Sequence, residues 1–122
     1  MKVPGPDHPI TIEPFDGRVS VRFAGLSIAD SRKALILREA AYPPVFYIPR
    51  DDVALASMSR TDRVTHCPYK GDASYYTVDA GGERVVDAAW SYEDPYPAMA
   101  RIRGHLAFYG NKVDIQADTP GE

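Results

Sequence analysis

The sequence predicts a mainly β domain in which two short antiparallel sheets pack as an open barrel or tent, with one or two short helices. Three observations support this fold class. Short alternating or β-branched runs recur at spacings of about 8 to 15 residues. The 11 prolines and 9 glycines are spread between these runs and mark turns. Only two short segments have helical character, too few for the crossovers of a parallel sheet.

The strands are predicted from side-chain alternation and from β-branched or aromatic content. Residues 18–23 alternate polar and apolar side chains, which is typical of a half-buried strand. Gly81-Gly82 and Gly110-Asn111 are expected to form the turns of two later hairpins. The remaining strands are expected over residues 26–29, 34–39, 45–48, 74–78, 84–90, 106–109 and 113–115.

The inner faces of the sheets should hold the apolar side chains of these strands. Tyr75 and Tyr76 are neighbours on one strand, so their side chains should point to opposite faces. The expected inner residues are Val21, Phe23, Leu35, Leu37, Phe46, Ile48, Val78, Val86, Trp90, Phe108 and Ile115.

Two short helices are expected, over residues 51–58 and 95–102. Asp51 can cap the first helix by accepting hydrogen bonds from free amide groups of its first turn. Pro95 and Gly104 suit the start and the end of the second helix. We expect residues 1–9 to form an extended arm, 10–117 a single domain, and 118–122 a flexible tail.

Length, charge and composition exclude several classes of protein. The 122 residues suit one domain, and the 14 Lys and Arg against 17 Asp and Glu give a net charge of −3. This acidic excess argues against nucleic acid as a partner. We expect no membrane partner, because no run approaches the roughly 18 apolar residues of a membrane span. The start lacks the apolar run of a signal peptide, so we expect a cytoplasmic location.

Several motifs together carry a resemblance to a known family. They are Tyr-Ile-Pro-Arg-Asp-Asp-Val at 47–53, Thr-His-Cys-Pro-Tyr-Lys-Gly at 65–71, Ala-Ser-Tyr-Tyr at 73–76, Ala-Trp-Ser-Tyr-Glu-Asp-Pro at 89–95 and the segment 102–109. In combination they resemble the DUF427 family over about residues 18–116. The resemblance implies a small β-rich single domain without an established activity.

The family is sometimes labelled nucleotidyltransferase-like, but this sequence does not favour that chemistry. Such enzymes hold two Mg²⁺ ions with spaced carboxylates behind a Gly-Ser turn. Here Asp51 and Asp52 are adjacent, and the sequence contains no Gly-Ser pair.

The Cys67-Pro68-Tyr69-Lys70-Gly71 segment supplies the first candidate site. Gly71 suits a turn with positive φ, so Lys70 should project from a bend between strands. It would then hold an anion as a point charge, or it would be an ordinary turn lysine that is solvated or pairs with a surface acid. Cys67 is a candidate nucleophile if Lys70 supplies a positive field and His105 a base, or else a small buried apolar residue.

Glu39 and Glu93 are candidate acid or base groups, because a carboxyl group against an apolar wall can have a raised pKa. Their ordinary alternative is a salt bridge with an arginine. His66 is a poor partner for Cys67, since adjacent strand residues face opposite ways. No His-x-x-x-His or Cys-x-x-Cys spacing is present, so we expect no metal and no cofactor.

Tyrosine and tryptophan are the most informative residues for a binding site. Each keeps a polar atom that needs a partner, so these side chains favour half-wet cleft walls, although they also fill the cores of small β proteins. With Lys70 and His105, the expected ligand-binding residues are Tyr47, Tyr69, Trp90 and Tyr92.

Three functions remain open from the sequence. The first is a module that binds a small anionic ligand in a cleft lined by Tyr, Trp and Lys. The second is a small hydrolase or group transferase that uses Cys67 or a Glu–Lys pair. The third is a homodimeric interaction domain without a site, in which exposed aromatic residues form the partner surface.

Overall fold

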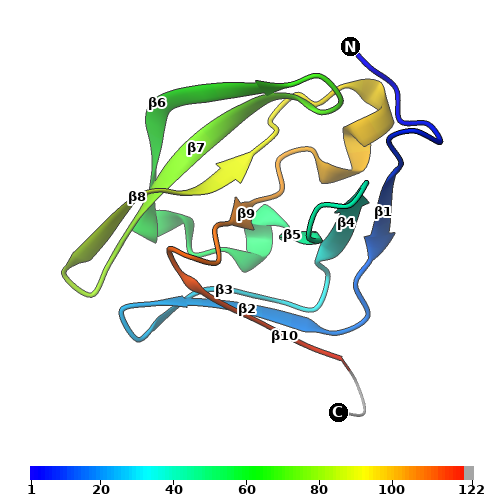
Figure 1. Ribbon diagram of the computed structural model, residues 1–122. Helices are drawn as coiled ribbons and strands as arrows, with labels where there is room; N and C mark the ends of the chain where they lie inside the picture. The colour runs from blue at the N-terminus through cyan, green and yellow to red at the C-terminus, as the bar shows by residue number, and fades with distance from the viewer. Residues whose placement is uncertain (120–122) are drawn as a thin grey trace.

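The computed structural model describes residues 1–119, and within them the chain forms ten strands and three short 3-10 helices (Figure 1). The mainly β fold with very few helices is confirmed. The helices are η1 (Arg50–Asp52), η2 (Leu55–Ser57) and η3 (Pro97–Ile102). The strands are β1 (Ile10–Pro14), β2 (Arg18–Phe23), β3 (Leu26–Ser31), β4 (Leu35–Glu39), β5 (Val45–Tyr47), β6 (Met58–Cys67), β7 (Gly71–Ala80), β8 (Glu83–Ser91), β9 (Ala107–Phe108) and β10 (Asp114–Asp118).

The strands form three antiparallel sheets, one more than predicted. Their orders are β1-β4-β5, β10-β2-β3 and β6-β7-β8-β9. In Figure 1, β2, β3 and β10 lie along the bottom, β6 and β7 along the top, and β4, β5 and β9 between them. The third sheet arises because β4 pairs with β1 and β5 instead of β3. The described chain forms no closed barrel.

Strand β7 is the centre of the fold, because both of its faces are buried. Eight of its ten residues are buried, where a strand with one wet face would alternate. Tyr76 belongs to the core cluster that includes Val19 and Val21 of β2. Tyr75 belongs to a second cluster with Leu37 of β4. The two tyrosines therefore point to opposite faces, as the sequence predicts.

The expected inner residues are confirmed, with one exception. Ten of the eleven are buried or pack against one of the two core clusters. The prediction for Val86 is wrong, since the residue is 57% exposed. Its neighbour Val85 packs against the first cluster, and successive strand residues face opposite ways, so Val86 must point outward.

The predicted helix over 51–58 is replaced by two single 3-10 turns. Val53 pairs with Ala29 of β3, and the amide of Ala54 donates to the Ile28 carbonyl at 2.7 Å. This pairing draws the backbone out of helical geometry after η1. Asp51 makes no capping hydrogen bond, whereas the Asp52 carboxylate accepts one from the Ser31 hydroxyl at 2.6 Å. The second predicted helix is present only as the shorter η3.

The ends of the domain also differ from the sequence analysis. Strand β1 begins at Ile10, directly after the predicted arm. The sequence analysis predicts neither this strand nor the largely exposed edge strand β6. The turn after Tyr109 forms, but β9 pairs with β8 and β10 with β2, so the last two strands make no hairpin. Asp118 lies in β10 instead of a tail, and residues 120–122 are outside the described residues.

Gly17 provides a test of how β10 docks on β2. A Cβ at position 17 would overlap the Asp118 carbonyl oxygen, so only glycine fits between the two strands. We predict that Gly17→Ala lowers the free energy of unfolding by about 1–3 kcal/mol, measured by urea denaturation. Gly5→Ala is the matched control, since a Cβ there meets nothing within 4 Å. Equal stability of the two variants would contradict the close approach.

Candidate functional site

A cavity of about 230 Å³ lies against β4, β5, β7 and β8, beside the β6–β7 turn. It is smaller than the roughly 300–1,000 Å³ of sites for drug-sized molecules, so it suits a ligand of a few heavy atoms. Its lining combines one ion pair with many aromatic side chains. The lining residues are Leu37, Glu39, Tyr42, Pro43, Val45, Tyr47, Lys70, Tyr75, Trp90, Tyr92 and Tyr109.

The tight turn between β6 and β7 delivers Lys70 to this cavity. Cys67 pairs with Gly71 across the hairpin, which leaves a loop of Pro68, Tyr69 and Lys70. Gly71 has φ = +109°, a conformation that favours glycine. The turn is held from the other side, because the Tyr96 amide donates to the Lys70 carbonyl at 3.0 Å. Lys70 is 7% exposed, so its ammonium group is withdrawn from bulk water.

A buried ion pair joins this turn to the end of β4. The Lys70 ammonium donates to Oε1 of Glu39, and Nε2 of His8 lies 2.7 Å from Oε2 of the same carboxylate. Burial acts to raise the pKa of Glu39, but hydrogen bonds from Lys70 and His8 outweigh it, so the pKa is lowered. Glu39 is therefore a stable carboxylate at neutral pH, not the raised-pKa acid that the sequence analysis considered.

The Lys70 ammonium keeps donor capacity for a further partner. An ammonium group has three N–H donors. One is directed to Glu39, and Sγ of Cys67 lies 3.8 Å from Nζ, a long and weak contact. At least one donor therefore has no strong acceptor among the described residues.

The aromatic wall of the cavity is held by its own hydrogen bonds and stacking. Nε1 of Trp90 donates to the Tyr47 hydroxyl at 3.3 Å, and the ring centroids of Trp90 and Tyr109 are 4.5 Å apart. Burial raises the pKa of Tyr47, and burial together with the Tyr75 hydroxyl raises the pKa of Tyr109 to about 12. These phenols therefore stay protonated at neutral pH.

Tyr92 is the most buried tyrosine of the cavity whose hydroxyl has no hydrogen-bond partner among the described residues. It is 8% exposed, and burial raises the pKa of its hydroxyl. No other group in residues 1–119 forms a hydrogen bond with that hydroxyl. No fully buried side-chain N or O atom in this part of the chain lacks a partner, so the Tyr92 hydroxyl must be reached from open space. The cavity that Tyr92 lines supplies that space.

The structure brings together five of the site residues expected from the sequence and separates the others. Glu39, Tyr47, Lys70, Trp90 and Tyr92 all line the cavity. Cys67 is not among its lining residues, although it packs against the same apolar cluster as Tyr47 and Tyr92.

Tyr69 points away from the cavity, toward the N-terminal arm. Its ring stacks on His8 with centroids 4.2 Å apart and an angle of 7° between the planes. His8 thereby connects the outside of the turn to Glu39 inside it.

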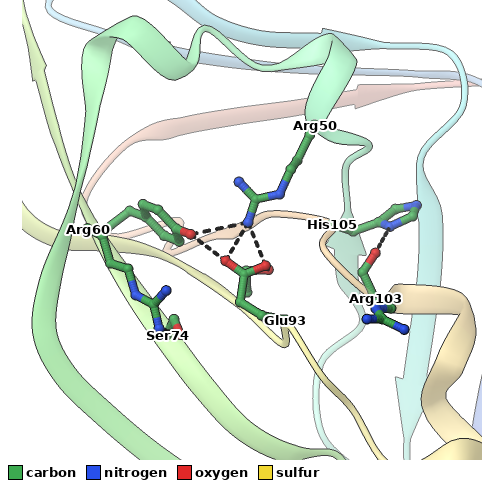
Figure 2. A network of polar contacts seen from close by, with 8 residues as sticks. Arg50, Arg60, Ser74, Glu93, Arg103 and His105 are labelled. Carbon is green, nitrogen blue, oxygen red and sulfur yellow. Dashed lines mark hydrogen bonds and ion pairs between the residues drawn. The ribbon is translucent and has the colours of Figure 1, made fainter.

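Glu93 belongs to a separate polar network (Figure 2). Its carboxylate contacts Nη2 of Arg50 at 2.5 and 2.7 Å and accepts a hydrogen bond from the Tyr76 hydroxyl at 2.5 Å. Burial acts to raise the pKa of Glu93, but hydrogen bonds from Tyr76 and Arg50 lower it overall. In Figure 2 His105 lies beside this network, with Nδ1 3.0 Å from the Arg103 carbonyl oxygen. His105 is not among the residues that line the cavity.

The cavity also contains residues that the sequence analysis missed. Tyr75 and Tyr109 line it, and the Tyr75 hydroxyl is 2.8 Å from that of Thr65. His8 pairs with a residue 31 positions away, and no local pattern reports such a contact. For Tyr75 the sequence offers one signal, because its side chain is expected on the face of the strand opposite to Tyr76.

The described residues were compared with what a metal site and a membrane-spanning helix each require. Within residues 1–119, no group of three or more His, Cys, Asp or Glu side chains could hold a metal ion. His66 faces solvent and pairs with Asp72 at 2.8 Å. No helix in the same residues has the length and apolar character to cross a membrane.

The pH dependence of stability should report the Glu39 ion pair. The pKa of Glu39 is lowered on folding, so its stabilisation is present above about pH 4.5 and is lost as the pH falls through the lower folded-state value. We predict that Glu39→Gln flattens this part of the curve of unfolding free energy against pH. The exposed Glu13→Gln should keep the wild-type slope. Identical curves for wild type and Glu39→Gln would contradict the assignment.

Comparison with known proteins agrees with the sequence motifs. A search of the curated proteins found no match. A family model described as "Domain of unknown function (DUF427)" matches residues 11–119, which is most of the chain. The motifs of the resemblance include Tyr47, Cys67, Lys70, Trp90 and Tyr92, so they supply much of the cavity and its turn. The chain therefore belongs to the DUF427 family.

Proposed function

We propose that the protein binds a small anionic molecule, a carboxylate, in the cavity between Lys70 and Tyr92. The observation that carries this proposal is the Tyr92 hydroxyl, a donor in a side chain that is more than nine-tenths buried and has no partner in residues 1–119. The hydroxyl is reached from the cavity, so a ligand placed there can accept the hydrogen bond that no described residue accepts. We expect the protein to act in the cytoplasm.

The groups available to a ligand are mainly donors. Lys70 has at least one N–H without a strong acceptor, and the hydroxyls of Tyr47 and Tyr92 keep their protons at neutral pH. A carboxylate has only acceptor sites and matches this set. Hydrogen bonds to a charged group are worth about twice those between neutral groups.

Glu39 sets the strength and the selectivity of this binding. Its charge already compensates Lys70, so a ligand anion must share the ammonium with it. We therefore expect modest affinity for simple acids. A ligand that also donates a hydrogen bond to Glu39 would bind more tightly, since it lowers the repulsion between the two carboxylates.

Acetate tests the proposal, with acetamide as its neutral isostere. We predict saturable binding of acetate by ligand-observed NMR, and at least tenfold weaker binding of acetamide. Tyr92→Phe should weaken acetate binding by about tenfold or more, because a hydrogen bond to a charged group is lost. It should leave the melting temperature unchanged, since that hydroxyl bonds to no described residue. Equal acetate binding by Tyr92→Phe would contradict the proposal.

Tyr76→Phe is the matched control on the other face of β7. It removes a hydroxyl that bonds to Glu93 and contacts Arg50, so we expect a loss of about 1 kcal/mol in unfolding free energy. Acetate affinity should stay at the wild-type value. The two Tyr→Phe changes thus separate binding from stability.

Catalysis by Cys67 is a second candidate, favoured by one contact. Sγ lies 3.8 Å from the Lys70 ammonium, which places a positive charge beside a candidate nucleophile. His105, the base expected from the sequence, instead contacts the Arg103 carbonyl oxygen at 3.0 Å and does not line the polar cavity. The third sequence hypothesis, a homodimer, stays a prediction. The large exposed apolar side chains are spread over six separate segments and are Met1, Val3, Leu26, Tyr42, Leu55, Val64 and Val86.

Iodoacetamide labelling tests the Cys67 candidate. If Cys67 is a nucleophile, it should react at pH 7 faster than free cysteine, and Lys70→Met should slow the reaction. The readout is the alkylated mass against time. Labelling no faster than free cysteine would exclude a catalytic thiol and leave the binding proposal untouched.

A further inference from the structure

A second cavity, of about 250 Å³, lies next to the first and has a different character. Apart from Trp90, its lining contributes no polar side-chain atom. It is formed on β2, β5, β9 and β10 mainly by Val19, Val21, Phe46, Ile48, Phe108 and Ile115. We refer to it as the apolar cavity, and to the cavity of Lys70 and Tyr92 as the polar cavity.

The two cavities share a wall made by Val45 and Trp90, which line both. The indole N–H of Trp90 donates to Tyr47, which lines the polar cavity and not the apolar one. Nε1 of Trp90, the single polar side-chain atom of the shared wall, is therefore hydrogen-bonded on the side of the polar cavity. Pro43 and Pro44, adjacent exposed residues before β5, line the polar and the apolar cavity respectively.

Water in the apolar cavity meets almost no polar side-chain atom. An aliphatic group that replaces this water is therefore favoured by burial of apolar surface. The lining residues Val19, Val21, Ile48 and Phe108 are buried, whereas Pro44 is exposed, so this cavity reaches from the core to the surface.

We propose that the natural ligand is a medium-chain amphiphilic carboxylate whose charged head occupies the polar cavity and whose aliphatic chain passes along the exposed Pro43–Pro44 edge into the apolar cavity. This inference rests on the proposed function for its head group and adds the chain. The polar cavity alone falls below the usual volume of ligand sites, whereas the two together lie within it.

Straight-chain carboxylates from acetate to octanoate are the test series. Each methylene group that enters an apolar site should increase affinity about fourfold, from the free energy of burying one CH₂. We expect this increase in isothermal titration at fixed pH and salt until the chain fills the apolar cavity.

Gly110→Leu identifies where the chain lies. Gly110 lines the apolar cavity, and a Cβ there would meet only Cδ1 of Ile115, at an ordinary 3.9 Å. The added side chain should occupy the cavity without strain. We predict wild-type affinity for acetate but loss of the chain-length increase. Gly5→Leu is the matched control, since Gly5 lies on the N-terminal arm with nothing near its Cβ.

The outcomes separate the two proposals. If acetate binds through Tyr92 but affinity does not rise with chain length, the inference is overturned and the proposed function stands. If affinity rises equally in Gly110→Leu, the chain lies elsewhere and the inference is again overturned. If no acid of the series binds, the proposed function itself fails.

Discussion

The ion pair between Lys70 and Glu39 is the constraint on which the site depends. Two charges in a poorly solvated position are tolerated only when they are paired and hydrogen-bonded. Lys70 meets this condition through Glu39, and Glu39 through Lys70 and His8. Three segments far apart in the sequence, the N-terminal arm, the end of β4 and the β6–β7 turn, are thereby held at one point. Removing one partner would leave the other charge uncompensated beside the cavity.

Strand β7 separates this ion pair from the second polar network. Its two buried faces send Tyr75 to the cavity side and Tyr76 to the network of Arg50 and Glu93. The ion pair joins Lys70, Glu39 and His8, whereas the second network joins Arg50, Glu93 and the Tyr76 phenol. They differ in what remains open. Tyr76 is bonded to Glu93, whereas the Tyr92 hydroxyl bonds to nothing else in residues 1–119.

Local pattern and turn chemistry account for what the sequence predicts well. Alternation located most strands, Gly81-Gly82 located the central hairpin, and period-two geometry assigned Tyr75 and Tyr76 to opposite faces. The Cys-Pro-Tyr-Lys-Gly element also indicated that Lys70 projects from a bend. Lys70 was assigned to one binding site with Tyr47, Trp90 and Tyr92 because these aromatic side chains are amphipathic.

Long-range pairing accounts for most of what the sequence does not predict. The number of sheets depends on β4 choosing β1 and β5 as neighbours, and the end of the predicted helix depends on Val53 meeting Ala29. Strand β6 is mostly polar and exposed, so no apolar period marks it. Tyr69 and Lys70 are adjacent in a turn, where side-chain direction is not set by a simple period, and only Lys70 enters the cavity.

The most direct measurement of the central claim is a crystal structure of the protein with propionate. The account predicts density for the acid in the polar cavity, with its carboxylate within hydrogen-bond distance of the Lys70 ammonium and the Tyr92 hydroxyl. Propionate bound only at exposed arginines such as Arg60, with no acid in the cavity at a saturating concentration, would contradict it.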